Sequence, residues 1–266
     1  MIRGDPQTER RGLAPLLTVT GITKRFGGVE ALGGCTLSVG EGSITGLIGP
    51  NGAGKTTLFN VISGLAPADD GEIRLGVDRL DGLSAHAIAR QGVGRTFQIP
   101  RPLGRMTVLE NVLVYAHGQP GEALTRVFTQ PKRVRAEESR SRARVHAILE
   151  SVELAHLASA RADTLSGGQK KLLELARALM SEPRIILLDE PGAGVNPTLM
   201  RSLVEAIRAL RAAGRTFLLI EHDMDLVTEL CDPVIVMAEG RTLTEGPFAE
   251  VRRDPRVLEA YLGSAS

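Results

Sequence analysis

The sequence has few cysteines, almost no net charge and no long hydrophobic run. Its two cysteines, Cys35 and Cys231, are far apart and have no second Cys or His at the spacing of a metal site. We therefore expect two reduced, packed thiols of a cytosolic protein, because disulfides persist in oxidising compartments. The 32 basic and 31 acidic residues give a formal charge of +1. The chain as a whole therefore has no field that would attract nucleic acid or lipid, and such a partner would need a local patch.

The hydrophobic runs are too short to cross a bilayer, which takes roughly 18 or more apolar residues in succession. The start of the chain has five charged side chains in its first eleven residues, and it lacks the apolar stretch of a secretion signal. We expect a chain that neither spans a membrane by itself nor is exported, with residues 1–14 as a flexible tail and residues 15–262 as one domain.

A glycine-rich segment is the most informative feature that is present. It fits the phosphate-binding loop pattern G-x-x-x-x-G-K-[ST], and it lies between an apolar run at 43–48 and a helix-like run at 57–63, as that pattern requires. Glycines let successive N–H groups point at phosphate oxygens, and the next helix adds its positive N-terminal end. Lys55 supplies a charge for the outer phosphates, and Thr56 supplies a hydroxyl for Mg²⁺. The residues expected to contact a nucleoside triphosphate are Gly49, Pro50, Asn51, Gly52, Ala53, Gly54, Lys55, Thr56 and Thr57.

Strand-like and helix-like segments follow one another along the chain, which indicates an α/β fold. The runs at 185–188 and 217–220 are continuously apolar, as in strands of a parallel sheet that are covered on both faces. Residues 106–164 are mostly helix formers with apolar spacing, so we expect a helical subdomain there. The runs expected to form strands are 16–20, 43–48, 71–77, 184–189, 216–221 and 232–238.

Polar side chains follow two of these apolar runs. Asp189 and Glu190 end one run, and His222 follows the other. Because ligands of α/β proteins bind at the carboxyl edge of the sheet, we expect these side chains beside the phosphate loop. Asp189 is then a candidate ligand of Mg²⁺, Glu190 a candidate base for the water that attacks the γ-phosphate, and His222 a candidate partner of that phosphate. Each also has a simpler interpretation as a cap of the helix that follows.

The segment Ser166-Gly167-Gly168-Gln169 opens a strongly helical run at 170–180. Ser166 has the character of an N-cap, and the glycines expose N–H groups at the helix start, so this segment is a second candidate anion site. One nucleotide needs only one such site. If two copies face each other head to tail, each Ser166 segment closes over the triphosphate held by the Lys55 loop of the other copy. We therefore expect two ATP molecules sandwiched in a twofold dimer.

Taken in order, these motifs resemble the nucleotide-binding subunits of ATP-binding cassette transporters, from about residue 16 to residue 262. The resemblance implies a P-loop NTPase cassette that hydrolyses ATP with Mg²⁺ and drives solute movement through separate membrane subunits. It implies a RecA-like α/β core with an antiparallel β subdomain at 15–98 and 184–246, a helical signature subdomain at 99–183 and C-terminal helices at 247–262. By matching position, Lys55 binds phosphates and Gln98 senses Mg²⁺. Glu190 is then the general base, and His222 is the switch histidine.

Finer features are similar to the branched-chain amino-acid importer ATPases of bacteria. These features are the sequences at 95–98, 106–111, 193–197 and 220–224, the added residues at 118–144 and the ending at 260–263. The similarity implies a peripheral subunit at the cytoplasmic face of the bacterial inner membrane. Its implied partners are transmembrane permease subunits, a second ATPase subunit of the same or a related kind and, indirectly, a periplasmic binding protein. A different solute, such as urea or another amide, and a non-transport regulatory role are the alternatives.

Two positions depart from the wider family. Its adenine-stacking aromatic is commonly a tyrosine, and the corresponding residue here is Phe26, which keeps the aromatic face and loses the hydroxyl. The loop after the base commonly carries an aspartate, whereas Asn196 keeps an acceptor and loses the charge. We expect stacking to survive, and charge-dependent contacts across the dimer to change.

Residues 99–106 join apolar and basic groups in a segment that prolines stiffen. We hypothesise that they dock a helix of the permease through Leu103 and Met106, and a plain loop between subdomains is the alternative. The basic cluster at 118–144 is interleaved with glutamates and has only Phe128 to stack on a base. We therefore favour a solvated helix face over nucleic-acid binding there.

Other classes of protein fit these motifs less well. Nucleoside kinases and GTPases share the phosphate loop, but they do not account for residues 165–169, and the sequence has no Asn-Lys-x-Asp for reading guanine. A nucleic-acid machine with this core needs a long coiled coil, and the stretch from Thr56 to Ser166 is too short to hold one. A regulatory subunit that binds ATP without hydrolysing it is the alternative that is more difficult to exclude. The presence of both Glu190 and His222 argues against it.

Overall fold

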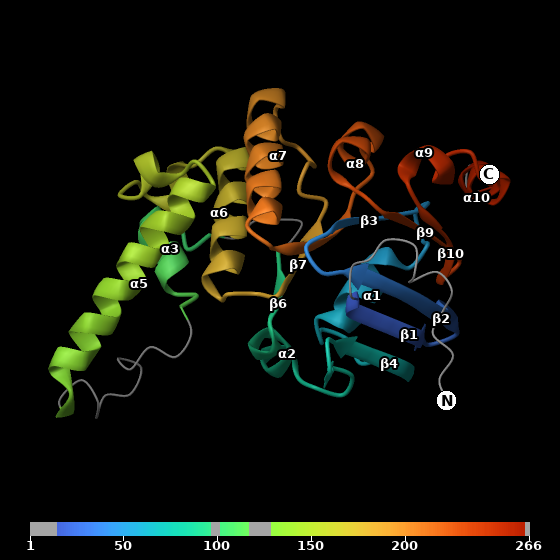
Figure 1. The fold of residues 1–266 in the computed structure, drawn as a ribbon, viewed down its shortest axis with the longest axis horizontal. Helices are drawn as coiled ribbons and strands as arrows, with labels where there is room; N and C mark the ends of the chain where they lie inside the picture. The colour runs from blue at the N-terminus through green and yellow to red at the C-terminus, as the bar shows by residue number, and fades with distance from the viewer. Residues whose placement is uncertain (1–14, 97–101, 117–128, 264–266) are drawn as a thin grey trace. The chain divides into compact units, whose positions relative to one another are not determined.

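The computed structural model describes residues 15–96, 102–116 and 129–263, and the chain divides into two compact units (Figure 1). The first unit comprises residues 1–95, 184–192 and 211–266. The second comprises residues 96–183 and 193–210. The expected N-terminal tail and Gln98 lie outside the described residues.

An antiparallel sheet of four strands lies in the first unit. Its order is β2–β1–β4–β5, with β1 (Pro15–Phe26) between β2 (Val29–Gly40) and β4 (Asp70–Leu75), and β5 (Asp78–Arg79) at the edge. The alternating burial of β1 is that of a strand with one face covered by the core. The expected antiparallel subdomain near the N-terminus is confirmed.

The second sheet of this unit has six strands in the order β10–β9–β3–β8–β7–β6. Five of them are parallel, and β10 pairs antiparallel with β9 at one edge. β3, β7 and β8 are buried along their whole length, and all six runs that the sequence marks as strands are strands. The bounds are β3 (Ile44–Ile48), β6 (Val93–Arg95), β7 (Ile185–Asp189), β8 (Thr216–Ile220), β9 (Val234–Ala238) and β10 (Arg241–Gly246).

Helix α1 (Lys55–Ile62) follows the phosphate loop and packs into the core of the first unit. Its Leu58, Phe59 and Ile62 side chains are fully buried and lie on one face of the helix. They join a hydrophobic cluster with residues of β1, β2, β3, β7 and β8, so the start of α1 is fixed against the sheet. The other helices of this unit are α2 (Ala85–Gln91), α8 (Met224–Leu230), α9 (Phe248–Val251) and α10 (Pro255–Gly263).

The second unit is helical. Helices α3, α5 and α6 pack against one another. The helical character expected for residues 106–164 is confirmed for the parts that the structure describes, 106–116 and 129–164. Within the described ranges, no helix is both long enough and apolar enough to cross a bilayer. The unit consists of α3 (Val108–Leu113), α5 (Pro131–Ser151), α6 (Gly167–Met180), most of α7 (Pro197–Ala212), and the short 3-10 helices η3 (Ala155–Leu157) and η4 (Ala162–Thr164).

Helix α5 carries the basic residues at 131–144, most of which are exposed to solvent. Val145 and Leu149 are its buried residues. Its arginines Arg133 and Arg142 form ion pairs with glutamates one helical turn away. The prediction of a solvated helix face is confirmed for residues 131–144, and residues 117–128 lie outside the described part of the chain.

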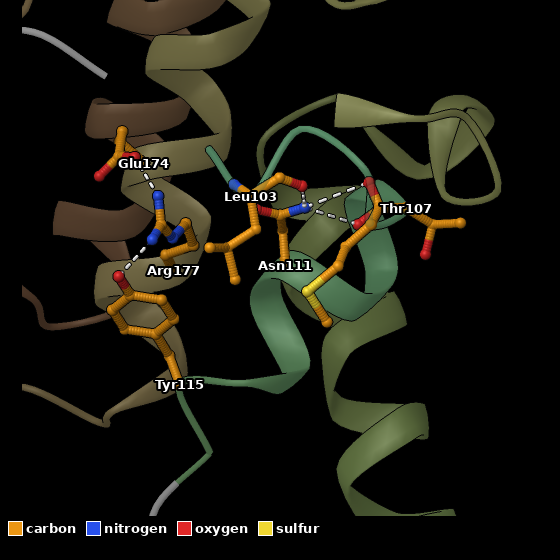
Figure 2. A network of polar contacts seen from close by, with 7 residues as sticks. Leu103, Thr107, Asn111, Tyr115, Glu174 and Arg177 are labelled. Atoms are coloured by element: carbon orange, nitrogen blue, oxygen red, sulfur yellow. Dashed lines mark hydrogen bonds and ion pairs between the residues drawn. The ribbon is translucent and has the colours of Figure 1, made fainter. Parts of the chain in front are cut away.

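A buried asparagine fixes the loop that precedes α3 (Figure 2). Asn111 has no exposed surface, and its side-chain oxygen accepts a hydrogen bond from the Leu103 N–H at 2.8 Å. Its side-chain nitrogen donates to the carbonyl oxygens of Leu103 at 3.1 Å and Thr107 at 2.9 Å. One side chain therefore binds both main-chain groups of Leu103. Thr107 in turn caps α3 in a reciprocal arrangement with Glu110.

Replacing Asn111 with leucine is expected to destabilise the helical unit by about 1 to 3 kcal/mol, the cost of one buried polar group left unpaired. Leucine has a similar volume but leaves the Leu103 N–H without its acceptor, whereas the Leu103 carbonyl still accepts from the Met106 N–H at 2.9 Å. Urea unfolding followed by circular dichroism measures the change. The control is Arg105→Ala, an exposed position in the same loop, which should change the free energy of unfolding by less than about 0.5 kcal/mol. Equal changes in the two variants would contradict the role of Asn111.

Candidate functional site

The phosphate loop links β3 to α1 and is shaped by glycines. Gly49, Gly52 and Gly54 have φ angles of 151°, 80° and 95°. A Cβ atom on Gly49 would lie 2.1 Å from the Met237 carbonyl oxygen, and one on Gly54 would lie 2.6 Å from a carbonyl of β2. No side chain fits at either position. The tight curl leads directly into the first turn of α1, where the N–H groups have no acceptors within the helix and attract an anion.

The side chain of Lys55 folds back onto this loop. Its Nζ atom donates hydrogen bonds to the carbonyl oxygens of Gly49 at 2.7 Å and Pro50 at 2.9 Å. Burial lowers the pKa of Lys55, whereas the charges of Glu190 and Asp189 raise it. The ammonium group of Lys55 therefore lies beside the glycine-rich loop and the N-terminus of α1. Together these three features suit the phosphates of a nucleotide. Beside Lys55, Thr56 is exposed and Thr57 half-buried.

Asp189 ends β7, and its carboxylate is held by an arginine of the neighbouring strand. Arg95 of β6 donates to Oδ2 of Asp189 at 3.1 Å, and both side chains are largely buried. Arg95 also donates to the side-chain oxygens of Asn60 at 2.8 Å and Ser63 at 2.9 Å, near the end of α1. This arginine therefore ties the carboxylate to the helix of the phosphate loop. Burial lowers the pKa of Arg95, and the charge of Asp189 raises it.

Glu190 and His222 lie at the ends of two neighbouring parallel strands. The Nε2 atom of His222 is 3.0 Å from Oε1 of Glu190, and the Glu190 N–H donates to the Ile220 carbonyl at 3.0 Å. Both side chains retain exposed surface, 22% for Glu190 and 44% for His222. The pair can therefore face a reactant while the backbone that carries it is anchored in the sheet.

Capping does not explain these residues. Asp223, and not His222, caps α8, because its side chain accepts hydrogen bonds from the N–H groups of Asp225 and Leu226. Helix α7 begins well beyond Glu190, and the Asn196 side chain accepts from the Leu199 N–H at its start. The helix-cap interpretations of Asp189, Glu190 and His222 are therefore excluded.

Ser166 is the N-cap of α6, as predicted. Its hydroxyl accepts from the Gln169 N–H, and the Gln169 side chain accepts from the Ser166 N–H, so the two form a capping box. Gly167 is exposed with open space around it, whereas a Cβ atom on Gly168 would lie 2.6 Å from the side chain of Leu199 on α7. The helix start is thus held by its capping box, and Gly167 is exposed there.

Phe26 and Gln98 are the two remaining residues of the predicted site. Phe26 ends β1 with 53% of its surface exposed, and the ammonium of Lys24 lies 5.4 Å from the centre of its ring. An exposed aromatic face is available there, and stacking on adenine remains a prediction. Gln98, expected to sense Mg²⁺, lies outside the described residues.

Sequence reasoning assigned no role to Arg95 or to Tyr261 of α10. Burial raises the pKa of the Tyr261 hydroxyl, and the nearby backbone of Gly49 partly offsets this. Arg95 could have been suspected as a charge at the end of a strand, next to a strand that ends in a carboxylate. For Tyr261 the sequence offers no comparable signal.

Comparisons with known proteins agree on one group of relatives. Residues 32–193 match the family model described as ABC transporter, and residues 241–266 match the model described as branched-chain amino acid ATP-binding cassette transporter. The chain is 44% identical to the high-affinity branched-chain amino acid transport ATP-binding protein BraF of Pseudomonas aeruginosa, over 94% of this chain and 99% of that protein. It is 42% identical to the probable branched-chain amino acid transport ATP-binding protein LivG of Archaeoglobus fulgidus, over 94% and 96%.

Solved structures with the same fold include a nucleotide-free ATP-binding cassette from an ABC transporter. The TM-score is 0.80 at 40% sequence identity, and the match covers 93% of this chain and 98% of that one. The ADP conformation of an ATP-binding cassette gives a TM-score of 0.78 at 38% identity, covering 94% and 99%. The expected cassette fold is confirmed.

Replacing Glu190 with glutamine is expected to lower ATP turnover by about 10²- to 10⁴-fold, because the amide cannot accept a proton from water. ATP binding should persist, since the phosphate loop and Lys55 are unchanged. Phosphate release measures turnover, and a fluorescent ATP analogue measures affinity. Asp225→Asn, an exposed acid nearby, is the control and should retain turnover. Unchanged hydrolysis by Glu190→Gln would remove Glu190 from the role of base.

Proposed function

We propose that this chain, which belongs to the ABC transporter family and is an ABC-type ATPase, energises an importer of branched-chain or other hydrophobic amino acids. The observation that carries the solute class is the match of residues 241–266 to the branched-chain amino acid model. Relatives named for branched-chain amino acid transport, aligned over 94% of the chain, support it.

The residues of the site divide the work of ATP hydrolysis. The loop at 49–56 and the start of α1 bind the phosphates, and Lys55 exchanges its two carbonyl partners for phosphate oxygens. Glu190 accepts a proton from the attacking water. His222, in contact with Glu190, hydrogen-bonds the γ-phosphate and orients the reactants.

The metal expected with the nucleotide is Mg²⁺, which takes oxygen ligands and neutralises phosphate charge. Asp189 and the Thr56 hydroxyl are oxygen donors of that kind, and Gln98 is the third expected donor. Among the described residues, no cluster of three or more acidic, histidine or cysteine side chains could hold a metal by itself. Mg²⁺ in nucleotide sites is bound by one or two carboxylates together with phosphate oxygens and water, so this donor set is sufficient.

A second ATPase subunit would complete the site. The capped start of α6 leaves Gly167 exposed with open space around it, and one nucleotide already has the start of α1 as its anion site. We infer that a second copy, or a related subunit, places its Ser166 segment over the triphosphate held by the Lys55 loop. The two nucleotides would then be shared between two chains.

The loop before α3 is the proposed contact with the permease. Leu103 is 43% exposed, although Asn111 binds its N–H and its carbonyl (Figure 2). An apolar side chain that a fixed backbone presents to solvent suits docking of a partner helix. Val114 and Tyr115 of the same unit are also exposed, at 52% and 38%, so apolar surface is available beyond Leu103. This contact would hold the chain at the cytoplasmic face of the membrane.

The function is tested with the assembled transporter in vesicles. ATPase activity should rise when a branched-chain amino acid and its periplasmic binding protein are both added, and either alone should have a smaller effect. Stimulation by urea or another amide with its own binding protein, and none by branched-chain amino acids, would move the assignment to that solute. Hydrolysis that no solute stimulates would favour a regulatory ATPase.

Replacing Leu103 with aspartate is expected to abolish stimulation by the permease and to leave nucleotide affinity unchanged. A charge at this exposed position disrupts an apolar contact with the partner but does not touch the core. Val77→Asp, an 87% exposed apolar position in the other unit, is the matched control and should keep the stimulation. Loss of nucleotide affinity in Leu103→Asp, or loss of stimulation in both variants, would count against the docking role.

A further inference from the structure

Glu221 is a buried carboxylate that the chemistry above does not use. It comes directly after β8 and before His222, and only 4% of its surface is exposed. Its Oε1 atom accepts a hydrogen bond from the Gly192 N–H at 2.7 Å, and its Oε2 atom accepts from the His222 N–H at 3.1 Å. Because main-chain donors bind both oxygens in the interior, Glu221 is not available as a proton acceptor for a reactant.

The two N–H groups belong to the two chain segments that carry the Glu190–His222 pair. Gly192 follows Glu190 by two residues, and His222 is itself a member of the pair. The last link of the parallel ladder is the hydrogen bond from the Glu190 N–H to the Ile220 carbonyl, at 3.0 Å. Glu221 therefore adds a side-chain link beyond the point where the main-chain ladder ends.

The backbone of Glu190 needs such support. Its φ angle is +48°, in the left-handed region that residues with a Cβ atom adopt only at a cost. A conformation of this kind persists where its surroundings fix it. The bond from Gly192 to Glu221 fixes the chain just past Glu190, on the side where the sheet no longer does so.

A role in packing or charge neutralisation explains Glu221 less well. Burying a carboxylate is costly unless it is hydrogen-bonded, and an apolar side chain would fill the same space without that cost. Its neighbour Cys231 offers no positive charge: burial, with a contribution from the charge of Glu221, raises the pKa of that thiol to about 12. What this carboxylate contributes is its two bonds to the main chain.

We propose that Glu221 is a positioning residue, whose carboxylate binds the main chain on both sides of the Glu190–His222 contact and holds Glu190 where it accepts a proton from water. The inference rests on the proposed function, in which Glu190 is the base. It concerns the rate of the chemical step and not the binding of nucleotide, because the Lys55 loop makes no hydrogen bond with Glu221 in the described residues.

The test compares Glu221→Ala with Glu221→Gln. The alanine variant should lower kcat on the order of 10²-fold, because a small displacement of a catalytic group costs about that much. KM and the affinity for a fluorescent ATP analogue should not change. Glutamine keeps an acceptor for one N–H and presents an N–H₂ group to the other, so its kcat should lie between those of alanine and wild type. Asp225→Ala, an exposed acid on α8, is the matched control and should keep wild-type kcat.

Amide hydrogen exchange adds a readout that does not depend on turnover. In Glu221→Ala the Gly192 and His222 amides should exchange faster, while the amides of α1 keep their protection. A wild-type kcat in both Glu221 variants overturns the proposal. Equal losses of thermal stability, nucleotide affinity and kcat in both variants also overturn it, because they indicate a structural role only.

Two controls keep the test decisive. Should Glu221→Ala fail to fold, Glu221→Gln decides alone: a lowered kcat at unchanged affinity supports the proposal, and an unchanged kcat contradicts it. Failure of the proposed function is recognised separately. If Glu190→Gln retains turnover, Glu190 is not the base and the inference about Glu221 is overturned with it. If Glu190→Gln is inactive and the Glu221 variants are fully active, only the inference about Glu221 is wrong.

Discussion

The parallel pairing of β7 with β8 determines where the reactive side chains lie. Asp189 is in register with Ile220, so the chain leaves both strands at the same edge, and His222 meets Glu190 at 3.0 Å. A slip of one residue would send each side chain to the opposite face of the sheet and separate the pair. The register is held by strands that are apolar and buried along their length. The geometry of the site is thus a consequence of core packing. A change in the strand register would disrupt it even if every reactive side chain were still present.

Local patterns account for the parts of the fold that the sequence predicts. The apolar runs of β3, β7 and β8 and the loop at 49–56 are visible without knowledge of any partner. Strands β2 and β10 cannot be recognised from the sequence in this way, because β2 contains the pair Gly33 and Gly34 and β10 is a short, mostly polar run. Both become strands through pairing: β2 with β1, across several shifts of register, and β10 with β9. Each strand is therefore ordered by the strand before it in the chain and not by an apolar pattern of its own.

At the site, too, the sequence predicts some features and not others. Motif spacing identifies Lys55, Asp189, Glu190 and His222 one by one, but it cannot identify what holds them. Arg95 joins Asp189 to α1 across 94 residues of sequence, and Glu221 joins Gly192 across 29. Such contacts involve single charged side chains whose burial only the folded chain creates. The stability of the fold comes from apolar burial, whereas the orientation of its carboxylates comes from a few costly polar bonds, and the two can be altered separately.

Lys55 shows how the site is prepared for its ligand. An unpaired ammonium in the interior would be expensive, and the carbonyls of Gly49 and Pro50 hold it in place. Those neutral acceptors bind a cation less strongly than charged phosphate oxygens do, so a nucleotide can displace them. The loop itself need not be rebuilt, because Gly49 and Gly54 already lie against the main chain of β9 and β2. Binding therefore exchanges weaker bonds for stronger ones at little cost in ordering, which is the advantage of a cradle formed before its ligand arrives.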